Sequence, residues 1–304
     1  MICTKLGLPG LLLVAALLPA HAQNARTWIS GAGIDQAGCG AIASPCRTLQ
    51  YAHNATVSGG EIDVKDAAGY GSVTITKAIS IINDGVGTAG VLATAGNNAI
   101  TVNAGASDGV TLRGLTIEGS GAGNNGVELK AGAGLTMANC VVQGFTSNGL
   151  SLKNGTSVLT NSTFANNGGS GISLYANYYT DLTIDNVLSN QNGSNGIAIL
   201  SDFSSPIAAR ITRSVITNNP NNSGIYLQGT SGLASVIIET STIANNRYGI
   251  ATFSAGSEMF VGRSTITGNE YGYYKAGGNI YSYRDNHIVR NSNSLGTLST
   301  ATAQ

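Results

Sequence analysis

The sequence predicts an all-β fold: a single-stranded right-handed parallel β-helix, a solenoid of about ten coils with a short N-terminal capping helix. Three observations lead to this prediction. Charged residues make up only 10% of the 304 residues, whereas 42 are glycine and 42% are hydrophobic. A glycine-led apolar motif recurs at intervals of 22 to 28 residues. No long stretch shows the periodicity of an amphipathic helix, so we expect strands joined by turns.

The repeat consists of a glycine, an apolar or aromatic residue and a short alternating run. It begins at Gly126, Gly149, Gly171, Gly196, Gly224, Gly249 and Gly272. A second column of apolar residues keeps the same period: Ile117, Val142, Phe164, Leu188, Ile216, Ile243, Ile266 and Ile288. No single unit can bury its apolar face alone. We therefore expect successive units to stack, with inward side chains packed on one another and backbone groups paired between coils.

Other repeat architectures fit this pattern less well. Leucine-rich repeats require a leucine framework that this sequence lacks, and a propeller blade takes roughly forty residues, well above the observed period. The calcium-binding nonapeptide pattern is also missing. The β-helix is therefore the expected architecture.

The first 22 residues are typical of a secretory signal peptide. Lys5 supplies a positive start, an apolar run follows, and Ala20-His21-Ala22 forms a cleavage site before Gln23. No later segment reaches the roughly 20 apolar residues of a membrane-spanning helix. Cleavage leaves 14 basic and 15 acidic residues, which implies no basic patch for nucleic acid. We expect a protein that is secreted, periplasmic or on the cell surface, with no membrane span and no nucleic-acid partner.

The chain is expected to divide into a signal peptide (1–22), an N-terminal segment and cap (23–58), a parallel β-helix (59–291) and a Ser/Thr-rich C-terminal tail (292–304). In the cap, Ser44 and Pro45 suit the start of a short helix. Leu49, Ala52 and His53 are expected to face the first coil. The tail offers no clear cap, so end-to-end association through the C-terminal edge is a further expectation.

Two cysteines are predicted to form a disulfide. Cys39 and Cys46 lie close together in an exported, oxidising context, and closing so short a loop stabilises by about 2–3 kcal/mol in the chain-entropy model. Cys140 then remains unpaired. It occupies an apolar strand position, so we expect it to behave as a small buried hydrophobe and not as a reactive thiol.

Several N-terminal segments together resemble a family of exported bacterial right-handed β-helix repeat proteins in the pectin-lyase-like superfamily. They are Arg26-Thr-Trp-Ile-Ser-Gly, Pro45-Cys46-Arg47-Thr48-Leu49, Gly59-Gly60-Glu61-Ile62-Asp63-Val64, Tyr70-Gly71 and the run from Val73 to Ile81. With the coils that follow, the resemblance covers nearly the whole mature chain. It implies the β-helix fold and export. It implies no reaction, because this branch has no assigned activity and a shared fold is a weak argument for function.

Catalytic residues of the superfamily are mostly missing. Relatives that hydrolyse pectin carry paired aspartates, a Gly-His-Gly and an Arg-x-Lys, and none of these motifs occurs here. Lyases need acidic calcium ligands and a basic residue that removes a proton beside a uronate. The nearest candidates are Asp181, Asp185, Asp202, Arg210 and Arg213. The alternative for these residues is turn and surface acids paired with arginines. No metal site or cofactor is expected, and calcium enters only if the lyase interpretation holds.

Aromatic residues recur at outward positions of the glycine-led strand or in its loop. These candidate ligand-binding residues are Tyr175, Tyr178, Tyr179, Phe203, Tyr226, Phe253 and Tyr274. If they line one side of the rod, they suit an extended saccharide, because sugar rings stack on aromatic faces and amides bond sugar hydroxyls. The alternative is that tyrosine simply suits a half-exposed β surface.

Two further columns concern structure. Lys130 and Lys153 fall at matching positions of adjacent coils, where Glu128 or Glu118 would offset their repulsion. Asn139, Asn161 and Asn186 recur at one coil corner, where stacked asparagines are able to bond in a ladder.

The sequence therefore favours an exported, non-catalytic β-helix that binds polysaccharide on an aromatic face or serves as a surface or matrix scaffold. The alternative is a lyase, hydrolase or epimerase acting on acidic glycans.

Overall fold

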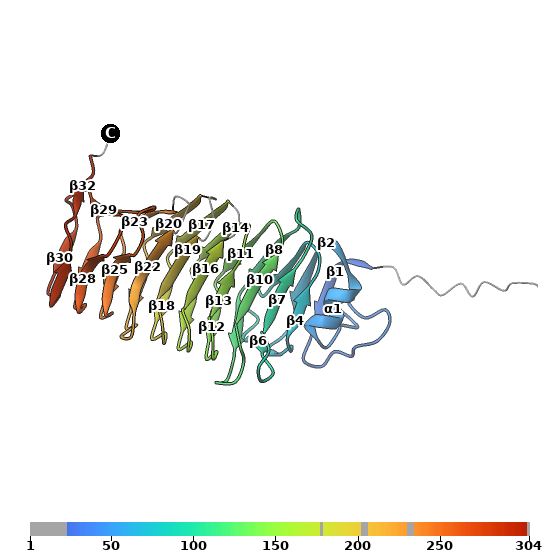
Figure 1. The fold of residues 1–304 in the computed structure, drawn as a ribbon. Helices are drawn as coiled ribbons and strands as arrows, with labels where there is room; N and C mark the ends of the chain where they lie inside the picture. Colours follow the sequence, from blue (N-terminus) through green and yellow to red (C-terminus); the bar gives the residue numbers. More distant parts are fainter. Residues whose placement is uncertain (1–22, 177–178, 202–205, 230–233, 303–304) are drawn as a thin grey trace, which may run out of the picture.

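The computed structural model describes residues 23–176, 179–201, 206–229 and 234–302, which wind into a right-handed parallel β-helix (Figure 1). Each coil passes in turn through three sheets, named sheets 1, 2 and 3 below. Sheet 1 has 12 strands, and sheets 2 and 3 have 10 each. The predicted all-β solenoid and its approximate number of coils are confirmed. The described residues contain no helix with the length and apolarity needed to cross a membrane.

All three sheets are parallel and follow chain order from coil to coil. Sheet 1 comprises β1 (Asn24–Ile29), β2 (Thr56–Val64), β5 (Ile79–Ile82), β8 (Gly109–Arg113), β11 (Gly134–Ala138), β14 (Thr156–Thr160), β17 (Thr180–Asp185), β20 (Ile207–Thr212), β23 (Ala234–Glu239), β26 (Ser257–Gly262), β29 (Asn279–Ser282) and β32 (Ser299–Thr300). Sheet 2 comprises β3 (Ala68–Gly69), β6 (Ala89–Leu92), β9 (Leu115–Glu118), β12 (Val141–Gln143), β15 (Thr163–Ala165), β18 (Leu188–Asn190), β21 (Val215–Thr217), β24 (Thr242–Ala244), β27 (Thr265–Thr267) and β30 (His287–Val289). Sheet 3 comprises β4 (Val73–Ile75), β7 (Ile100–Asn103), β10 (Val127–Ala131), β13 (Leu150–Leu152), β16 (Ile172–Ala176), β19 (Ile197–Ser201), β22 (Ser223–Gly229), β25 (Tyr248–Thr252), β28 (Tyr271–Lys275) and β31 (Asn293–Leu295).

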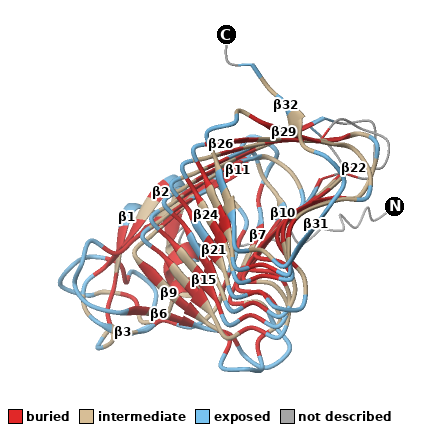
Figure 2. Cartoon of the chain, turned by 90° about the vertical axis from the view of Figure 1, so that its left-hand side faces the viewer, coloured by how far each residue is buried: buried red, intermediate tan, exposed pale blue. Residues whose placement is uncertain are grey.

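The core runs along the axis of the solenoid (Figure 2). Side chains alternate inward and outward along each strand, and the parallel register places like positions above one another. One inward column of sheet 1 is Ile81, Leu112, Met137, Leu159, Ile184, Ile211, Ile238 and Val261, each no more than 1% exposed. The second predicted column is buried in sheet 2 with two exceptions, the half-buried Ile288 of the last coil and Leu188. Leu188 is 37% exposed, because Ser189 pairs with Phe164 and takes the inward position.

The corner between sheets 1 and 2 is a two-residue turn that repeats along most of the rod. Its first residue has a positive φ, as in Asn139, Asn161 and Asn186. The Asn186 side chain donates to Asn161 at 2.8 Å, so these two members of the predicted corner ladder are bonded. The second residue points inward. Where it is a serine, it bonds to the same position of the next coil; the Ser214 backbone N–H, for example, donates to the Ser241 hydroxyl at 3.2 Å.

Cys140 occupies one of these inward corner positions. It is 1% exposed, and its thiol lies 3.4 Å from the Ala138 carbonyl oxygen. The hydroxyl groups of the corner serines likewise bond the carbonyl oxygen two residues earlier. Burial raises the pKa of Cys140 to about 11. The thiol therefore stays protonated at neutral pH, and the prediction of an inert buried cysteine is supported.

A second ladder of asparagines follows sheet 2, and all its members except the half-buried Asn291 are buried. It contains Asn167, Asn192, Asn219, Asn246, Asn269 and Asn291, and the side-chain oxygen of each later member accepts from the backbone N–H of the preceding one. The glycine column makes room for it. A Cβ on Gly224 would lie 2.8 Å from Asn246 Nδ2 and 2.8 Å from the Gly249 carbonyl oxygen. Glycine therefore recurs because neighbouring coils and the asparagine ladder leave no space for a side chain.

The N-terminal end is closed by helix α1 (Leu49–Ala55), β1 and a disulfide loop (Figure 1). The predicted Cys39–Cys46 disulfide is present. Leu49, Ala52 and His53 are buried as predicted. The predicted start at Ser44 was wrong, because Thr48 is the N-cap and its hydroxyl accepts from the Tyr51 N–H at 3.3 Å.

The C-terminal end presents strand edges. Residues 292–302 contain β31 and β32, which continue sheets 3 and 1. Val289 and Leu295 are 50% and 43% exposed there. End-to-end association through this edge stays a prediction.

His53 predicts a pH dependence of stability. Its Nε2 accepts the Thr76 N–H at 3.2 Å, and its Nδ1 lies 3.2 Å from Asn54 Oδ1, an arrangement suited to the neutral ring. Burial, with a smaller contribution from the nearby Lys77 ammonium, lowers the pKa of His53. His53 therefore binds a proton more readily in the unfolded chain than in the folded one. The stability that the neutral, buried ring contributes is present above about pH 6.5 and is lost as the pH falls below it. Denaturant unfolding of wild type and His53→Gln at several pH values checks this. The stability difference should shift in favour of the variant on acidification, and a pH-independent difference would contradict it.

Candidate functional site

The outer face of sheet 3 carries a continuous row of residues along the whole rod. The parallel register aligns Thr74, Thr101, Glu128, Ser151, Ser173, Ala198, Tyr226, Ala251 and Tyr274. The row is polar near the N-terminal end, small in the middle and aromatic near the C-terminal end. One face therefore offers three kinds of surface to an elongated ligand.

At the C-terminal end of this row, five rings gather over β22, β25 and β28. We call Tyr226, Tyr248, Phe253, Tyr271 and Tyr274 the aromatic cluster. The Tyr226 and Phe253 rings stack at 4.8 Å, and Tyr248 and Tyr274 lie 4.6 Å apart with their planes tilted by 53°. All five are half-buried. The Arg247 guanidinium also lies 5.0 Å from the centre of the Tyr248 ring.

The structure brings together only some of the predicted aromatic residues. Tyr226, Phe253 and Tyr274 belong to the cluster. Tyr175 lies on β16 in a different row, paired with Leu200, and is 41% exposed. Tyr179 precedes β17 of sheet 1 and is 59% exposed. Tyr178 and Phe203 lie outside the described residues.

Tyr248 and Tyr271 are cluster members that the sequence reasoning did not assign to the ligand-binding set. Each directly precedes a glycine of the repeat, Gly249 or Gly272. Their side chains join the cluster because β25 and β28 begin at these tyrosines and pair in register. The sequence signal for these two residues is a tyrosine that directly precedes the repeat glycine in two successive coils.

At the N-terminal end of the row, Glu128 holds two lysines. Glu128 is only 7% exposed. One of its carboxylate oxygens lies 3.0 Å from Lys153 Nζ and the other 3.5 Å from Lys130 Nζ. Asn98 Nδ2 donates to the latter oxygen at 2.7 Å. Burial alone would raise the pKa of Glu128, but Lys153 and Asn98 outweigh it and the pKa is lowered. Glu128 is therefore a fixed carboxylate, and it offsets the lysine repulsion as expected.

The lyase candidates lie on sheet 1 and its corner. Asp181 and Asp185 share the outer face of β17, as period-two counting predicts, but stand about 13 Å apart along the strand. Asp185 is paired with Arg213, and Asp181 accepts from the Tyr179 hydroxyl at 3.0 Å. Asp202 lies outside the described residues.

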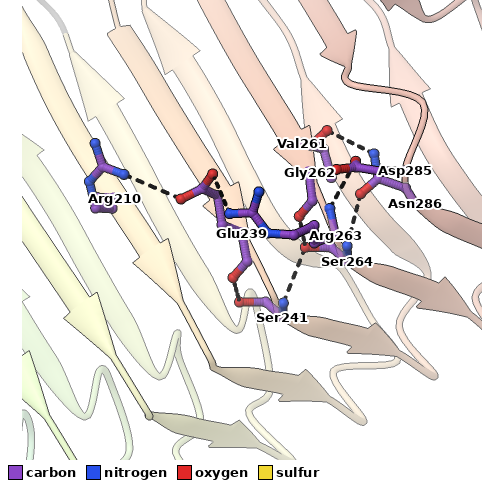
Figure 3. A network of polar contacts seen from close by, with 9 residues as sticks. All are labelled: Arg210, Glu239, Ser241, Val261, Gly262, Arg263, Ser264, Asp285 and Asn286. Atoms are coloured by element: carbon purple, nitrogen blue, oxygen red, sulfur yellow. Dashed lines mark hydrogen bonds and ion pairs between the residues drawn. The ribbon is translucent and has the colours of Figure 1, made fainter. Parts of the chain in front are cut away.

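Arg210 belongs to a separate polar network (Figure 3). Glu239 accepts from Arg263 at 2.9 Å and from Arg210 at 3.4 Å, and Asp285 accepts from the Arg263 backbone N–H at 2.9 Å. These contacts tie together β20, β23 and the two coils beyond. Among residues 23–176, 179–201, 206–229 and 234–302, no group of three or more His, Cys, Asp or Glu is placed to hold a metal ion. Of the candidate residues, Asp185 and Arg210 are therefore engaged in ion pairs between coils, with Arg213 and Glu239 respectively.

A family model described as "Right handed beta helix region" matches residues 49–209. The chain belongs to this right-handed β-helix family. No curated protein sequence matches it. Among solved structures, the β-helix is similar to pectate lyase Pel9A, with 15% identity over 91% of this chain and 80% of that chain and a TM-score of 0.64. It is also similar to an alginate lyase from Paenibacillus sp., with 15% identity over 83% of this chain and 96% of that chain and a TM-score of 0.58. At these identities the likeness establishes the fold alone.

Proposed function

We propose that this protein is an exported, non-catalytic β-helix scaffold whose sheet 3 binds an extended polysaccharide. The observation that carries the proposal is the aromatic cluster, five half-buried rings from three successive coils on one face. Because all five rings are only half-buried, part of their aromatic surface is accessible to a sugar ring. The names of two structural neighbours, a pectate lyase and an alginate lyase, also refer to acidic polysaccharides.

The proposal predicts that two tyrosines of the aromatic cluster are needed for binding. We expect Tyr248→Ala/Tyr274→Ala to bind its polymer about 5- to 30-fold more weakly, because losing two aromatic contacts costs on the order of 1–2 kcal/mol. A glycan-array screen identifies the polymer, and calorimetry on the array hits measures the loss.

Sheet 1 supplies the matched control for this experiment. Phe260 and Tyr281 form another stacked pair on adjacent coils, with centroids 4.8 Å apart. Phe260→Ala/Tyr281→Ala should keep wild-type affinity. Equal losses in both double variants, or full binding by the sheet 3 variant, would contradict the assignment of the aromatic cluster.

A second candidate function is catalysis on an acidic glycan by a lyase, hydrolase or epimerase. The observation that favours it is a cavity of about 350 Å³ on sheet 1, lined by Asp181, Arg210 and neighbouring residues. An acid and a cation there could contact a uronate. A lyase needs a base that removes a proton, and Arg210 would be the candidate in this cavity. Its ion pair with Glu239 favours the protonated guanidinium, which is no base, so the binding scaffold is the preferred proposal.

A further inference from the structure

A cavity of about 550 Å³ lies over the first strands of sheet 3, well separated along the row from the aromatic cluster. Its lining includes Thr74, Thr101 and Glu128, the first three members of the outward row on β4, β7 and β10. Gln50 of helix α1 and Asn124 also contribute. The cavity therefore occupies the end of the row that the capping helix covers.

The lining is suited to a ligand rich in hydroxyl groups. Among its side chains, Val73 alone is aliphatic, and the others are mainly hydroxyls and amides, which both donate and accept hydrogen bonds. Glu128 is held in place by Lys153 and Asn98. Lys130 makes the longer contact to Glu128, 3.5 Å, so its ammonium retains donors for a ligand. Sugar hydroxyls, which also donate and accept, match this set.

Helix α1 closes the N-terminal side of the cavity. The Gln50 side-chain oxygen accepts the Thr74 N–H at 2.8 Å, which fixes the helix against β4, the first strand of sheet 3. Beyond Glu128 the row continues with Ser151, Ser173 and Ala198, which are small. A chain lying on this row thus meets a barrier at one end and open surface at the other.

We propose that this cavity is an end subsite, which holds the terminal sugar residue of the same polysaccharide that the aromatic cluster binds. The proposal rests on the proposed function of sheet 3. The chain end lies over Thr74 and Thr101, and the rest of the ligand follows the row toward Tyr226. The protein then recognises polysaccharide ends in preference to internal segments.

The spacing of the two regions sets a length requirement. Thr101 and Tyr226 are five coils apart on sheet 3, which corresponds to about 24 Å at the strand spacing of a β-sheet. An oligosaccharide that spans this distance contacts both regions, and its second contact is intramolecular. Shorter oligosaccharides reach one region only.

The test measures affinity against oligosaccharide length by calorimetry, with the full mature chain and oligomers of the polymer that the array identifies. We expect affinity to rise at least about tenfold once the oligomer spans both regions. Thr74→Val/Thr101→Val should abolish this rise and leave the binding of short oligomers to the aromatic cluster intact. Valine keeps the shape and strand preference of threonine and removes only the hydroxyl groups.

Two controls separate the possible results. Thr111→Val/Thr136→Val changes a register pair of threonines on sheet 1 and should keep the rise. A second set of oligomers carries a bulky group on one end or on the other. Only the group on the end that enters the cavity should abolish the rise of affinity with length, so this comparison also identifies that end. Length-independent binding that still depends on Tyr248 and Tyr274 would overturn the end subsite and leave the proposed function standing. Binding of no glycan would overturn both.

Discussion

Replacing Asn246 with leucine is expected to destabilise the solenoid by about 3–5 kcal/mol. Asn246 is 3% exposed. Its side-chain oxygen accepts from the Asn219 backbone N–H at 3.0 Å and from Asn219 Nδ2 at 2.9 Å, and its own Nδ2 donates to the Ile216 carbonyl at 3.2 Å and to Asn269 at 3.1 Å. Leucine has the same number and branching of side-chain heavy atoms, although it is bulkier, and it makes none of these bonds. Buried groups on the two neighbouring coils would lose these partners, at a cost of roughly 1–3 kcal/mol each.

Urea unfolding followed by circular dichroism measures this effect. Asn221→Leu is the matched control, because Asn221 is exposed and makes one surface bond to the Gly193 carbonyl. We expect the control to stay within about 0.5 kcal/mol of wild type. A small effect of Asn246→Leu would mean that the ladder is not a main source of stability.

Replacing Gly249 with alanine is expected to destabilise by about 3 kcal/mol, a large cost for one methyl group. A Cβ there would lie 2.4 Å from the Gly272 carbonyl oxygen and 2.8 Å from Ile266 Cγ2. The carbonyl belongs to the next coil, so relief of the clash requires the coils to separate. Such overpacking of a close backbone contact is poorly tolerated.

Gly109→Ala provides the comparison for this glycine. Its Cβ would meet nothing within 4 Å, and its φ is not positive. Alanine there should be neutral or stabilising by up to about 0.5–1 kcal/mol, because it restricts the unfolded chain. Equal unfolding midpoints for the two alanine variants would contradict the assigned role of the glycine column.

The glycine and apolar columns could be predicted because each depends on one residue type at one position per coil. The ladder of asparagines that follows sheet 2 could not be predicted. The turns after sheet 2 contain adjacent asparagines, such as Asn218-Asn219 and Asn245-Asn246. In each pair the first residue has a positive φ and is exposed, whereas the second is buried in the ladder. Asparagine suits both places, so composition alone does not say which residue points inward.

The candidate site was predicted in part for a similar reason. Tyr226 and Tyr274 share one outward row, and their position after a repeat glycine was enough to place them together. Tyr175 lies two residues further along its strand than that row, which puts it in the row of Leu200. Period-two alternation predicts the face of a sheet but not the row on it, which depends on the pairing of neighbouring coils.

The central claim is that sheet 3 binds a polysaccharide without cleaving it. The most direct measurement incubates the mature protein with the polymer that binds best, with and without calcium, and follows the ultraviolet absorbance of unsaturated uronyl products together with polymer size. The account predicts saturable binding that the Tyr248→Ala/Tyr274→Ala variant loses, with no new absorbance and no shortening of the polymer. Rising absorbance or shortening chains would contradict it and establish the protein as an enzyme.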